Sequence, residues 1–521
     1  MMGGVSNRGG QENTDSPLVV AVDIGTSSVR AALYDASGQE ISGTVSRVVR
    51  QFSTTRDGGA EDDPEEAIAT VARVIDNLLA QTHAFSSRID AVAVSCFWHS
   101  LIGVDVEGQA ITPLFGWADT RSARWTEELR RRFDERAVHA RTGCRFHSSY
   151  WPARLLWLKD ERAFVYSRVH RWMSFGEFLM ARFFGNNFAE ASASLASGTG
   201  MLNLRDIAWD AELVQGLDID AEQLPTIASA HKAVVGLAPA YARRWPSLNR
   251  ASWFPAIGDG AANNLGAGCV TRSSVALMVG TSGAMRVLYN GAPPAELPHA
   301  LWCYRADRER VVVGGALSDG GGLYGWMNEA LAVGFDEEEL SVALASMKPD
   351  AHGLTLLPFW SGERSTNWAM HARGAILGLT MHTSPLEILR AAMEAISYRF
   401  ALIAHALDSF APGAEIIASG GALAASPVWV QIICDVLGRP LKLSGTAEAS
   451  SRGAVLLALE ATGKINRLED APAPPVRIFE PDMAHHARYL SGLERQQKIY
   501  RQIIGNTEIA QAIYEASATE P

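Results

Sequence analysis

Two aspartates in this chain stand next to glycines at the end of an apolar run. Asp23 is followed by the turn Gly25-Thr26-Ser27-Ser28, which offers backbone N–H groups and three hydroxyls. Asp259 lies between two glycines after a second apolar run. A carboxylate beside a donor-rich turn suits a divalent metal and phosphate, and a carboxylate where backbone can approach closely suits a general base. From the residues alone, a plain hairpin and an Asx turn are equally open readings.

The first pattern returns about half a chain later. Residues 276–290 align with residues 21–35, with Ala, Gly, Thr, Ser, Leu and Tyr matching in place. Met278 stands opposite Asp23. This repeat predicts two related halves, each presenting a Gly-Thr-Ser turn between two strands. Two phosphate turns with one metal-site carboxylate suit a nucleotide held between two lobes.

Composition and charge narrow the classes of function. The 521 residues carry a formal net charge of −11, and the five cysteines are scattered without a Cys-x-x-Cys pair. We therefore expect no nucleic-acid partner and reduced thiols rather than a disulfide framework. No apolar stretch approaches the ~20 residues of a membrane helix, and residues 1–16 lack the apolar core of a signal peptide. These features predict a cytoplasmic protein without a membrane partner.

The elements that must position these residues alternate between strands and helices. In the first half we expect strands over 18–23, 31–34, about 39–49 and 89–94, and a helix that starts at Pro64 with Asp63 as its N-cap. Residues 115–250 are expected to be mostly helical. This order predicts an α/β arrangement with antiparallel strands beside parallel ones.

The second half continues in the same way. We expect a strand over 311–316, a helix over 385–410 with Ser384 and Glu387 as a capping box, a strand over 415–418, and helices over 428–437 and 454–461. The glycines at 320–325 match G-x-G-x-x-G. As a dinucleotide fingerprint the match is weak, because it does not open a βαβ unit.

Taken together, these motifs resemble the FGGY carbohydrate kinases, which are sugar kinases of the actin-like, ribonuclease-H-like ATPase fold. The resemblance covers about residues 18–480 and keeps the family's motif order: Asp23-Ile24-Gly25-Thr26, Trp117-x-Asp119-x-Arg121, Gly258-Asp259-Gly260, Gly280-Thr281-Ser282-Gly283, Gly362-Glu363-Arg364 and Ser419-Gly420-Gly421. Within the family the chain looks most like the gluconokinases, on His99-Ser100, Trp117 to Ser122, Arg141-Thr142-Gly143, Ser194 to Ser197 and Gly280 to Ala284.

The resemblance implies an α/β fold of two ribonuclease-H-like, actin-type ATPase lobes with a cleft between them. Residues 1–16 are expected to be a disordered tail. Residues 17–267 would form the N-terminal lobe with the sugar site and the first phosphate turn, residues 268–480 the nucleotide-binding C-terminal lobe, and residues 481–521 a helical tail. A homodimer is a possible assembly.

The resemblance also implies roles at matching positions. Asp259 would be the general base and would contact the sugar together with Trp98, His99 and Asn263. Asp23 would hold Mg²⁺ through water. The phosphates of ATP would be bound from opposite lobes, and adenosine would lie against glycines of the second half; the residues implied are Thr26, Ser27, Ser28, Arg30, Gly280, Thr281, Gly321, Gly420, Gly421 and Ala425.

Three positions depart from the family's usual pattern. Trp98 stands where Met is usual, so the bulkier wall can change which sugar fits. Residues 365–367 replace a usual proline, which leaves the shape of that loop open. Ala425 stands where a polar residue is common, and Ser426 could replace the missing contact to the base.

The implied activity is ATP-dependent phosphorylation of a small sugar or sugar acid. D-gluconate, giving 6-phosphogluconate, is the first choice, and D-xylulose or another pentulose or polyol is the alternative. Arg121 and Arg145 could neutralise a sugar carboxylate, but structural ion pairs are the favoured explanation for both. A non-catalytic sugar sensor is disfavoured because both Asp23 and Asp259 are present. Chaperones and filaments of the same fold are disfavoured by the pair His99 and Asp259.

Overall fold

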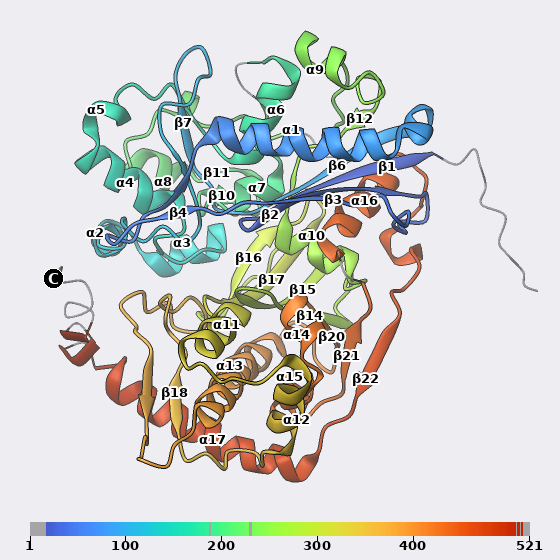
Figure 1. The fold of residues 1–521 in the computed structure, drawn as a ribbon. Coiled ribbons are helices and arrows are strands. Elements are labelled where there is room, and N and C mark those ends of the chain that lie inside the picture. The colour runs from blue at the N-terminus through green and yellow to red at the C-terminus, as the bar shows by residue number, and fades with distance from the viewer. Residues whose placement is uncertain are drawn as a thin grey trace, which may run out of the picture.

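The computed structural model describes residues 17–186, 189–228, 232–446, 448–506, 508–510 and 512–513. The predicted tail over residues 1–16 lies outside these described residues. The described chain forms two α/β halves stacked on each other, with the first half blue to green and the second mostly yellow to red (Figure 1). The predicted α/β class is confirmed.

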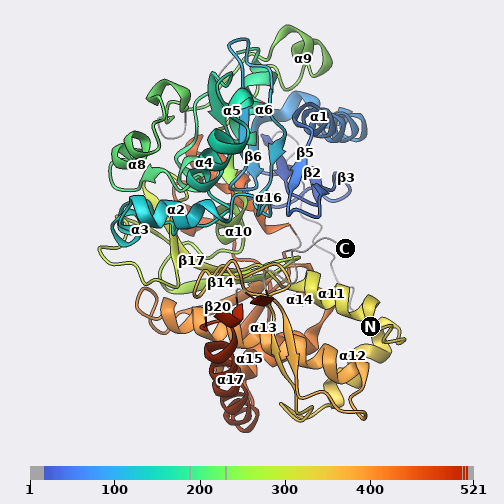
Figure 2. The same cartoon turned by 90° about the vertical axis from the view of Figure 1, so that its left-hand side faces the viewer.

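A mixed sheet forms the centre of the first half. Strands β1 (Leu18–Ile24), β2 (Ser28–Tyr34) and β3 (Ser46–Val49) form an antiparallel meander. Strand β6 (Ile89–Cys96) lies parallel to β1, and β12 (Ser252–Trp253) and β13 (Ile257–Gly258) lie parallel to β6. Strand β1 is buried along its whole length because helices cover both faces of the sheet. These are α1 (Pro64–Gln81) on one face and α16 (Ala449–Ala461) on the other (Figures 1 and 2).

Two local predictions in this half have different outcomes. Helix α1 begins as predicted: the Asp63 side chain accepts hydrogen bonds from the N–H groups of Glu65 and Glu66. The predicted strand over 39–49 is wrong in its first part, since β3 starts only at Ser46. Gly43, with φ at +76°, turns the chain just before that strand, and this conformation is incompatible with a continuous strand.

The second sheet repeats the topology of the first. Its order is β16-β17-β15-β14-β20-β21-β22, and the five strands from β17 to β21 have the same pairing directions as β3-β2-β1-β6-β12. The bounds are β14 Ser274–Val279, β15 Gly283–Asn290, β16 Trp302–Arg305, β17 Arg310–Leu317, β20 Glu415–Ser419, β21 Leu441–Ser444 and β22 Val476–Phe479. The internal repeat in the sequence therefore corresponds to a repeated sheet.

The two hairpins are not identical in register. Asp23 faces Arg30 in the first hairpin, whereas Met278 faces Ala284 in the second, so the second turn is one residue shorter. Gly25 N–H accordingly bonds Ser28 O in the first turn, and Gly280 N–H bonds Ser282 O in the second. The sequence alignment of the repeat thus holds for the first strand and slips by one residue in the second.

Long helices cover the second sheet. They are α11 (Gly321–Ala330), α12 (Glu337–Ser346), α13 (Pro385–Leu407), α15 (Pro427–Leu437) and α17 (Met483–Ile503). The predicted capping box is present at the start of α13, where Ser384 and Glu387 bond reciprocally. Within the described residues, no helix is long and apolar enough to cross a bilayer.

Residues 115–250 hold many short helices, but less than half of this segment is helical, so the prediction that it is mostly helical is wrong. Short elements complete the fold. They are β4 Ser53–Thr54, β5 Ala60–Asp62, η1 His83–Arg88, β7 Ile102–Val104, β8 Leu114–Phe115, α2 Trp125–Arg132, α3 Glu135–Thr142, α4 Trp151–Glu161, α5 Ala163–Tyr166, β9 Arg171–Met173, α6 Phe175–Phe184, α7 Ala193–Ser197, β10 Leu202–Asn203, β11 Ala208–Trp209, α8 Ala211–Gly216, η2 Ala221–Gln223, α9 Pro239–Arg244, β18 Thr355–Leu357, β19 Ala375–Leu377, α14 Gly421–Ala425 and η3 Leu468–Asp470.

Two helices in backbone contact join the halves. Helix α10 (Asp259–Gly266) crosses α16 at Gly266 and Gly453. A Cβ atom at Gly266 would lie 1.8 Å from the carbonyl oxygen of Ala449, and one at Gly453 would lie 1.8 Å from that of Ala262. Only glycine permits this approach. Helix α16 lies between β21 and β22 of the second sheet in the chain, yet it packs in the core of the first half. The lobe boundary near residue 267 stays a prediction.

Candidate active site

Asp259 is the first residue of α10, directly after β13 ends at Gly258. It therefore begins a helix and does not form the alternative Asx turn. Its two flanking glycines have a packing role that the sequence did not reveal, because both face the indole ring of Trp98. A Cβ atom at Gly258 would lie 2.0 Å from that ring, and one at Gly260 would lie 2.5 Å from it.

The Asp259 carboxylate lies in an environment that suits a base. Burial raises its pKa from 3.8 to about 6, and the nearby charge of Asp23 acts in the same direction. The guanidinium of Arg286 and the backbone N–H groups of Gly260 and Trp98 lower the pKa and limit the rise. The group is thus mostly ionised at neutral pH and still basic enough to accept a proton.

Asp23 lies at the same edge of the first sheet. Both Asp23 of β1 and Ile257 of β13 are in register with Ser95 of the intervening strand β6. Neighbouring strands lie about 4.8 Å apart, and β6 separates β1 from β13. The backbone of Asp23 therefore lies about 10 Å from that of Ile257, two residues before Asp259. Burial raises the pKa of Asp23, while the Ser95 hydroxyl and Arg30 lower it. Ligands of open α/β sheets bind at this carboxyl edge of the strands.

The first phosphate turn lies beside Glu448, a residue that sequence reasoning missed. Arg30 Nη1 lies 3.8 Å from Asp23 and 2.5 Å from Glu448 at the start of α16. Because 418 residues separate Arg30 from Glu448, no local pattern indicated this pair. In the turn itself Thr26 is half-buried, Ser27 is exposed and Ser28 is buried.

The glycines predicted to bind the nucleotide come together around the second turn. Gly321 N–H bonds Gly280 O at 2.8 Å, and the next amide bonds Thr281 O at 3.0 Å. Gly420, with φ at +103°, lies against the same strand, since a Cβ atom there would be 2.4 Å from Val279 O. The starts of α11 and α14 therefore converge on the Gly280-Thr281 turn. The nucleotide-binding roles of these residues stay predictions.

The last predicted adenosine contacts lie on and beside the short helix α14. Gly421 begins this helix and Ala425 ends it, and both are exposed. Ser426, the possible replacement for a polar residue at 425, accepts a hydrogen bond from Trp429 N–H as the cap of α15. The Ser426 hydroxyl oxygen therefore already accepts one hydrogen bond within the protein.

His99 is held as a neutral imidazole. Burial lowers its pKa to about 3, and its Nδ1 lies 2.5 Å from the carbonyl oxygen of Gly198. Nδ1–H must donate to that oxygen, which leaves Nε2 as an acceptor for a hydroxyl group. The rings of Tyr150 and Tyr304 lie 5.2 and 5.7 Å from the imidazole, and their hydroxyls bond each other at 2.6 Å.

The other two predicted sugar contacts are largely buried. Trp98 is only 6% exposed, its Nε1 donates to Ser194 O at 2.9 Å, and its ring lies 4.9 Å from that of Tyr304. Asn263 on α10 lies with its Oδ1 3.4 Å from Arg286 Nη1. Their contact with a sugar stays a prediction.

Two arginines of the second half also lie at this site. Arg286, on β15, is buried, with Nη1 3.4 Å from Gly260 O. Arg364 donates to Leu317 O at 2.7 Å and lies over the ring of Trp117, 4.7 Å from its centroid. The sequence partly indicated these two arginines, because Arg364 belongs to a family motif and Arg286 follows another. Neither arginine was assigned a role from the sequence.

The two arginines considered for a sugar carboxylate are paired within the protein. Arg121 forms ion pairs with Asp119 at 2.5 Å and Glu61 at 2.6 Å. Arg145 pairs with Glu135 at 2.7 Å. The favoured explanation of both as structural ion pairs is confirmed.

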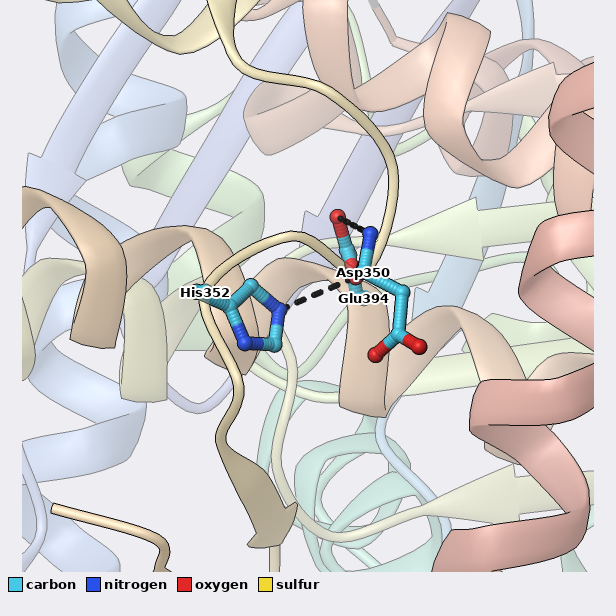
Figure 3. A group of neighbouring side chains, drawn as sticks. All are labelled: Asp350, His352 and Glu394. Carbon is cyan, nitrogen blue, oxygen red and sulfur yellow. Dashed lines mark hydrogen bonds and ion pairs between the residues drawn. The ribbon is translucent and has the colours of Figure 1, made fainter.

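A second polar cluster, Asp350, His352 and Glu394, lies in the second half (Figure 3). His352 Nε2 lies 3.1 Å from Glu394 Oε2, and Arg390 Nε donates to Glu394 Oε1 at 2.7 Å. Both carboxylate oxygens of Asp350 accept hydrogen bonds from Arg495 of α17. Because arginines already occupy these oxygens, the cluster is an ion network that ties α13 and α17 to this loop and does not suit a cation.

Comparison with known proteins agrees with this geometry. The N-terminal domain of the FGGY family of carbohydrate kinases matches residues 18–266, and the C-terminal domain of that family matches residues 275–462. A gluconokinase of Bacillus subtilis (strain 168) is 27% identical over 463 residues, covering 87% of this chain and 89% of the relative.

Solved structures give the same result. A gluconate kinase from Lactobacillus acidophilus is 26% identical, with a TM-score of 0.84 and coverage of 95% of this chain and 99% of that one. A xylulose kinase from the same species is also 26% identical, with a TM-score of 0.85 and coverage of 94% and 99%. The predicted pair of ribonuclease-H-like lobes is thereby confirmed. Because the two family domains match in order and together span most of its length, this chain belongs to the FGGY family of carbohydrate kinases.

Proposed function

We propose that this kinase transfers the terminal phosphoryl group of ATP to a hydroxyl of a small sugar acid, with D-gluconate as the substrate and 6-phosphogluconate as the product. The observation that carries the proposal is the Asp259 carboxylate, with its pKa raised to about 6 at the sheet edge that also holds Asp23. The choice of gluconate is supported by the gluconokinase and the gluconate kinase among the similar proteins.

In this reaction Asp259 accepts the proton of the reacting hydroxyl. The sugar oxygen forms a bond to the terminal phosphorus, and the bond from that phosphorus to the bridging oxygen of ADP breaks. His99 Nε2, free to accept a hydrogen bond, orients a second hydroxyl. The turns at Thr26 and Gly280 hold phosphate oxygens through backbone N–H groups. Such positioning supplies most of the catalysis in phosphoryl transfer.

The residues around Asp23 fit a magnesium ion. The carboxylate is buried, and its nearest cation, Arg30 Nη1, is 3.8 Å away and bonded more closely to Glu448. Asp23 would therefore hold the ion through water, as Mg²⁺ commonly requires. When bound, Mg²⁺ neutralises charge on the phosphate oxygens.

A ketose is the second candidate substrate, because the xylulose kinase among the similar structures has the same identity as the gluconate kinase. Coupled ADP release with a panel of D-gluconate, other aldonates, D-xylulose and glycerol separates the candidates. The sugar-acid proposal expects the highest kcat/KM for gluconate. A preference for D-xylulose would overturn the substrate and leave the kinase activity standing.

The role of Asp259 is tested by Asp259→Asn. We expect kcat to fall by about 10²-fold or more, the usual contribution of a general base, while calorimetry finds ATP binding unchanged. Asp76→Asn is a matched control, because Asp76 pairs with Arg244 on the surface and should leave turnover intact. Near-wild-type turnover of Asp259→Asn would show that the base is another group.

A further inference from the structure

Arg364 is a half-buried cation without an ion pair among the described residues. Among the described residues, no carboxylate lies within 4.0 Å of its guanidinium, and the hydrogen bond it makes is to the carbonyl oxygen of Leu317. Its Nε is buried and has no partner. An arginine stays charged in proteins, so burying it without a counterion costs free energy that a bound anion would offset.

The charge of Arg364 acts on the sugar side of the site. It lowers the pKa values of His99 and His147, and its electrostatic neighbours are Tyr304, Tyr150, Asp319 and Asp259. Asp319 is engaged by Ser361, whose N–H and hydroxyl donate to its carboxylate. The Cζ atom of Arg364 lies over the Trp117 ring, 4.7 Å from its centroid. A guanidinium beside a ring can still offer its N–H donors, and their fork matches a carboxylate in a bidentate pair.

The loop that carries Arg364 is fixed from behind by the preceding residue. Glu363 is fully buried, forms an ion pair with Arg399 of α13 and accepts a hydrogen bond from Tyr500 Oη at 2.5 Å. From the other side the loop packs on the first half, since Ser148 N–H lies 3.3 Å from Met370 Sδ. The guanidinium is therefore held in place before any substrate binds, which favours specific recognition.

Two other arginines lie near the site. Arg154 donates to the carbonyl oxygens of Ser148, His99 and Gly116. Arg286 has three oxygen atoms of α10 at 3.4 to 3.5 Å from Nη1, and its Nε, like that of Arg364, is buried without a partner. Arg286 is more deeply buried and acts on Asp259, whereas Arg364 is half-buried and therefore the more accessible of the two to a ligand.

We propose that the Arg364 guanidinium binds the carboxylate of the sugar acid. This inference rests on the proposed function, because it requires an acidic substrate whose hydroxyl is phosphorylated at Asp259. A second anion, the transferring phosphoryl group, would also attract this guanidinium, and the experiment separates the two.

The test compares Arg364→Met with Arg364→Lys on acidic and neutral substrates. For Arg364→Met we expect kcat/KM for D-gluconate to fall by about 10²-fold, mainly through KM, as is typical for loss of one partner of a buried ion pair. D-glucitol, the six-carbon polyol without the carboxylate, should keep its competitive inhibition constant or its turnover within about threefold. Arg364→Lys should recover part of the gluconate KM, because the charge returns without the fork.

Arg373→Gln controls for loosening of the loop. Arg373 donates to the carbonyl oxygens of Met370 and Ala372 in the same loop, so its loss should affect acidic and neutral ligands equally. Equal losses for gluconate and D-glucitol in Arg364→Met would assign Arg364 to the phosphoryl group or to loop structure and overturn the inference. Unchanged gluconate kinetics would also overturn it.

The wild-type panel separates failure of this inference from failure of the proposed function. If the wild type prefers a different aldonate, gluconate is the wrong substrate, and the variants are measured with that aldonate. If the wild type phosphorylates neutral sugars alone, the carboxylate inference is wrong while the kinase activity remains. If gluconate is the substrate and Arg364→Met keeps its KM, the function stands and the inference fails.

Discussion

Replacing Arg286 by glutamine should move the acid limb of the pH–rate profile upward. Arg286 is the strongest of the groups that lower the pKa of Asp259, which burial raises to about 6. Removing a nearby opposite charge shifts a carboxylate pKa by about one unit or more. One unit corresponds to about 1.4 kcal/mol of lost preference for the ionised base.

This shift predicts a loss that depends on pH. If the pKa moves from about 6 to about 7, the ionised fraction of Asp259 at pH 6.5 falls from about three quarters to about one quarter. At pH 8 the ionised fraction is about 0.99 in the wild type and about 0.9 in the variant. We therefore expect kcat/KM to fall about threefold at pH 6.5 and hardly at all at pH 8. His99 does not obscure this limb, because its pKa is about 3.

The assay is coupled ADP release from pH 5 to pH 9 at saturating Mg-ATP, with the sugar varied. Arg244→Gln serves as the control, since Arg244 pairs with Asp76 on the surface and its loss should leave the limb in place. Thermal unfolding of each variant shows whether the fold is kept. An acid limb that stays in place, or moves to lower pH in Arg286→Gln, would refute the assignment of the limb to Asp259 beside Arg286.

Two further predictions concern stability. Burial raises the pKa of Glu177 from 4.5 to about 7. Its protonated form therefore contributes its full stabilisation below pH 4.5, and this stabilisation is lost as the pH rises through 7. The free energy of unfolding of Glu177→Gln, measured by urea denaturation, should therefore exceed that of the wild type by about 3 kcal/mol at pH 8 and nearly equal it at pH 5. The same difference between the two proteins at both pH values would contradict this. Glu394→Gln should cost about 3 kcal/mol by leaving Arg390 without its carboxylate. EDTA should leave the melting temperature of the wild type unchanged, and a fall with EDTA that Glu394→Gln abolishes would indicate a metal at this cluster rather than at Asp23.

Local signals in the sequence predicted the elements that carry the site. The caps at Asp63 and Ser384 marked two helix starts correctly, because a cap depends on side chains within one turn of the backbone they bond. The strand–turn–strand repeat predicted two related halves, and both hairpins are present. The strand prediction was wrong at β3, where a glycine turns the chain. The repeat alignment was wrong in the second hairpin, whose turn is one residue shorter. An apolar pattern does not reveal differences of a single residue.

The sequence by itself determined the α/β class, the repeated sheets and the two aspartates of the site, since periodicity, caps and turn residues act over short stretches of chain. Only the tertiary structure decided which charges are neutralised. Arg121 and Arg364 look alike in sequence, yet the first forms an ion pair with Glu61 and the second has no carboxylate within 4.0 Å among the described residues. Partners such as Arg30 and Glu448, 418 residues apart, become neighbours only when α16 returns to the first sheet.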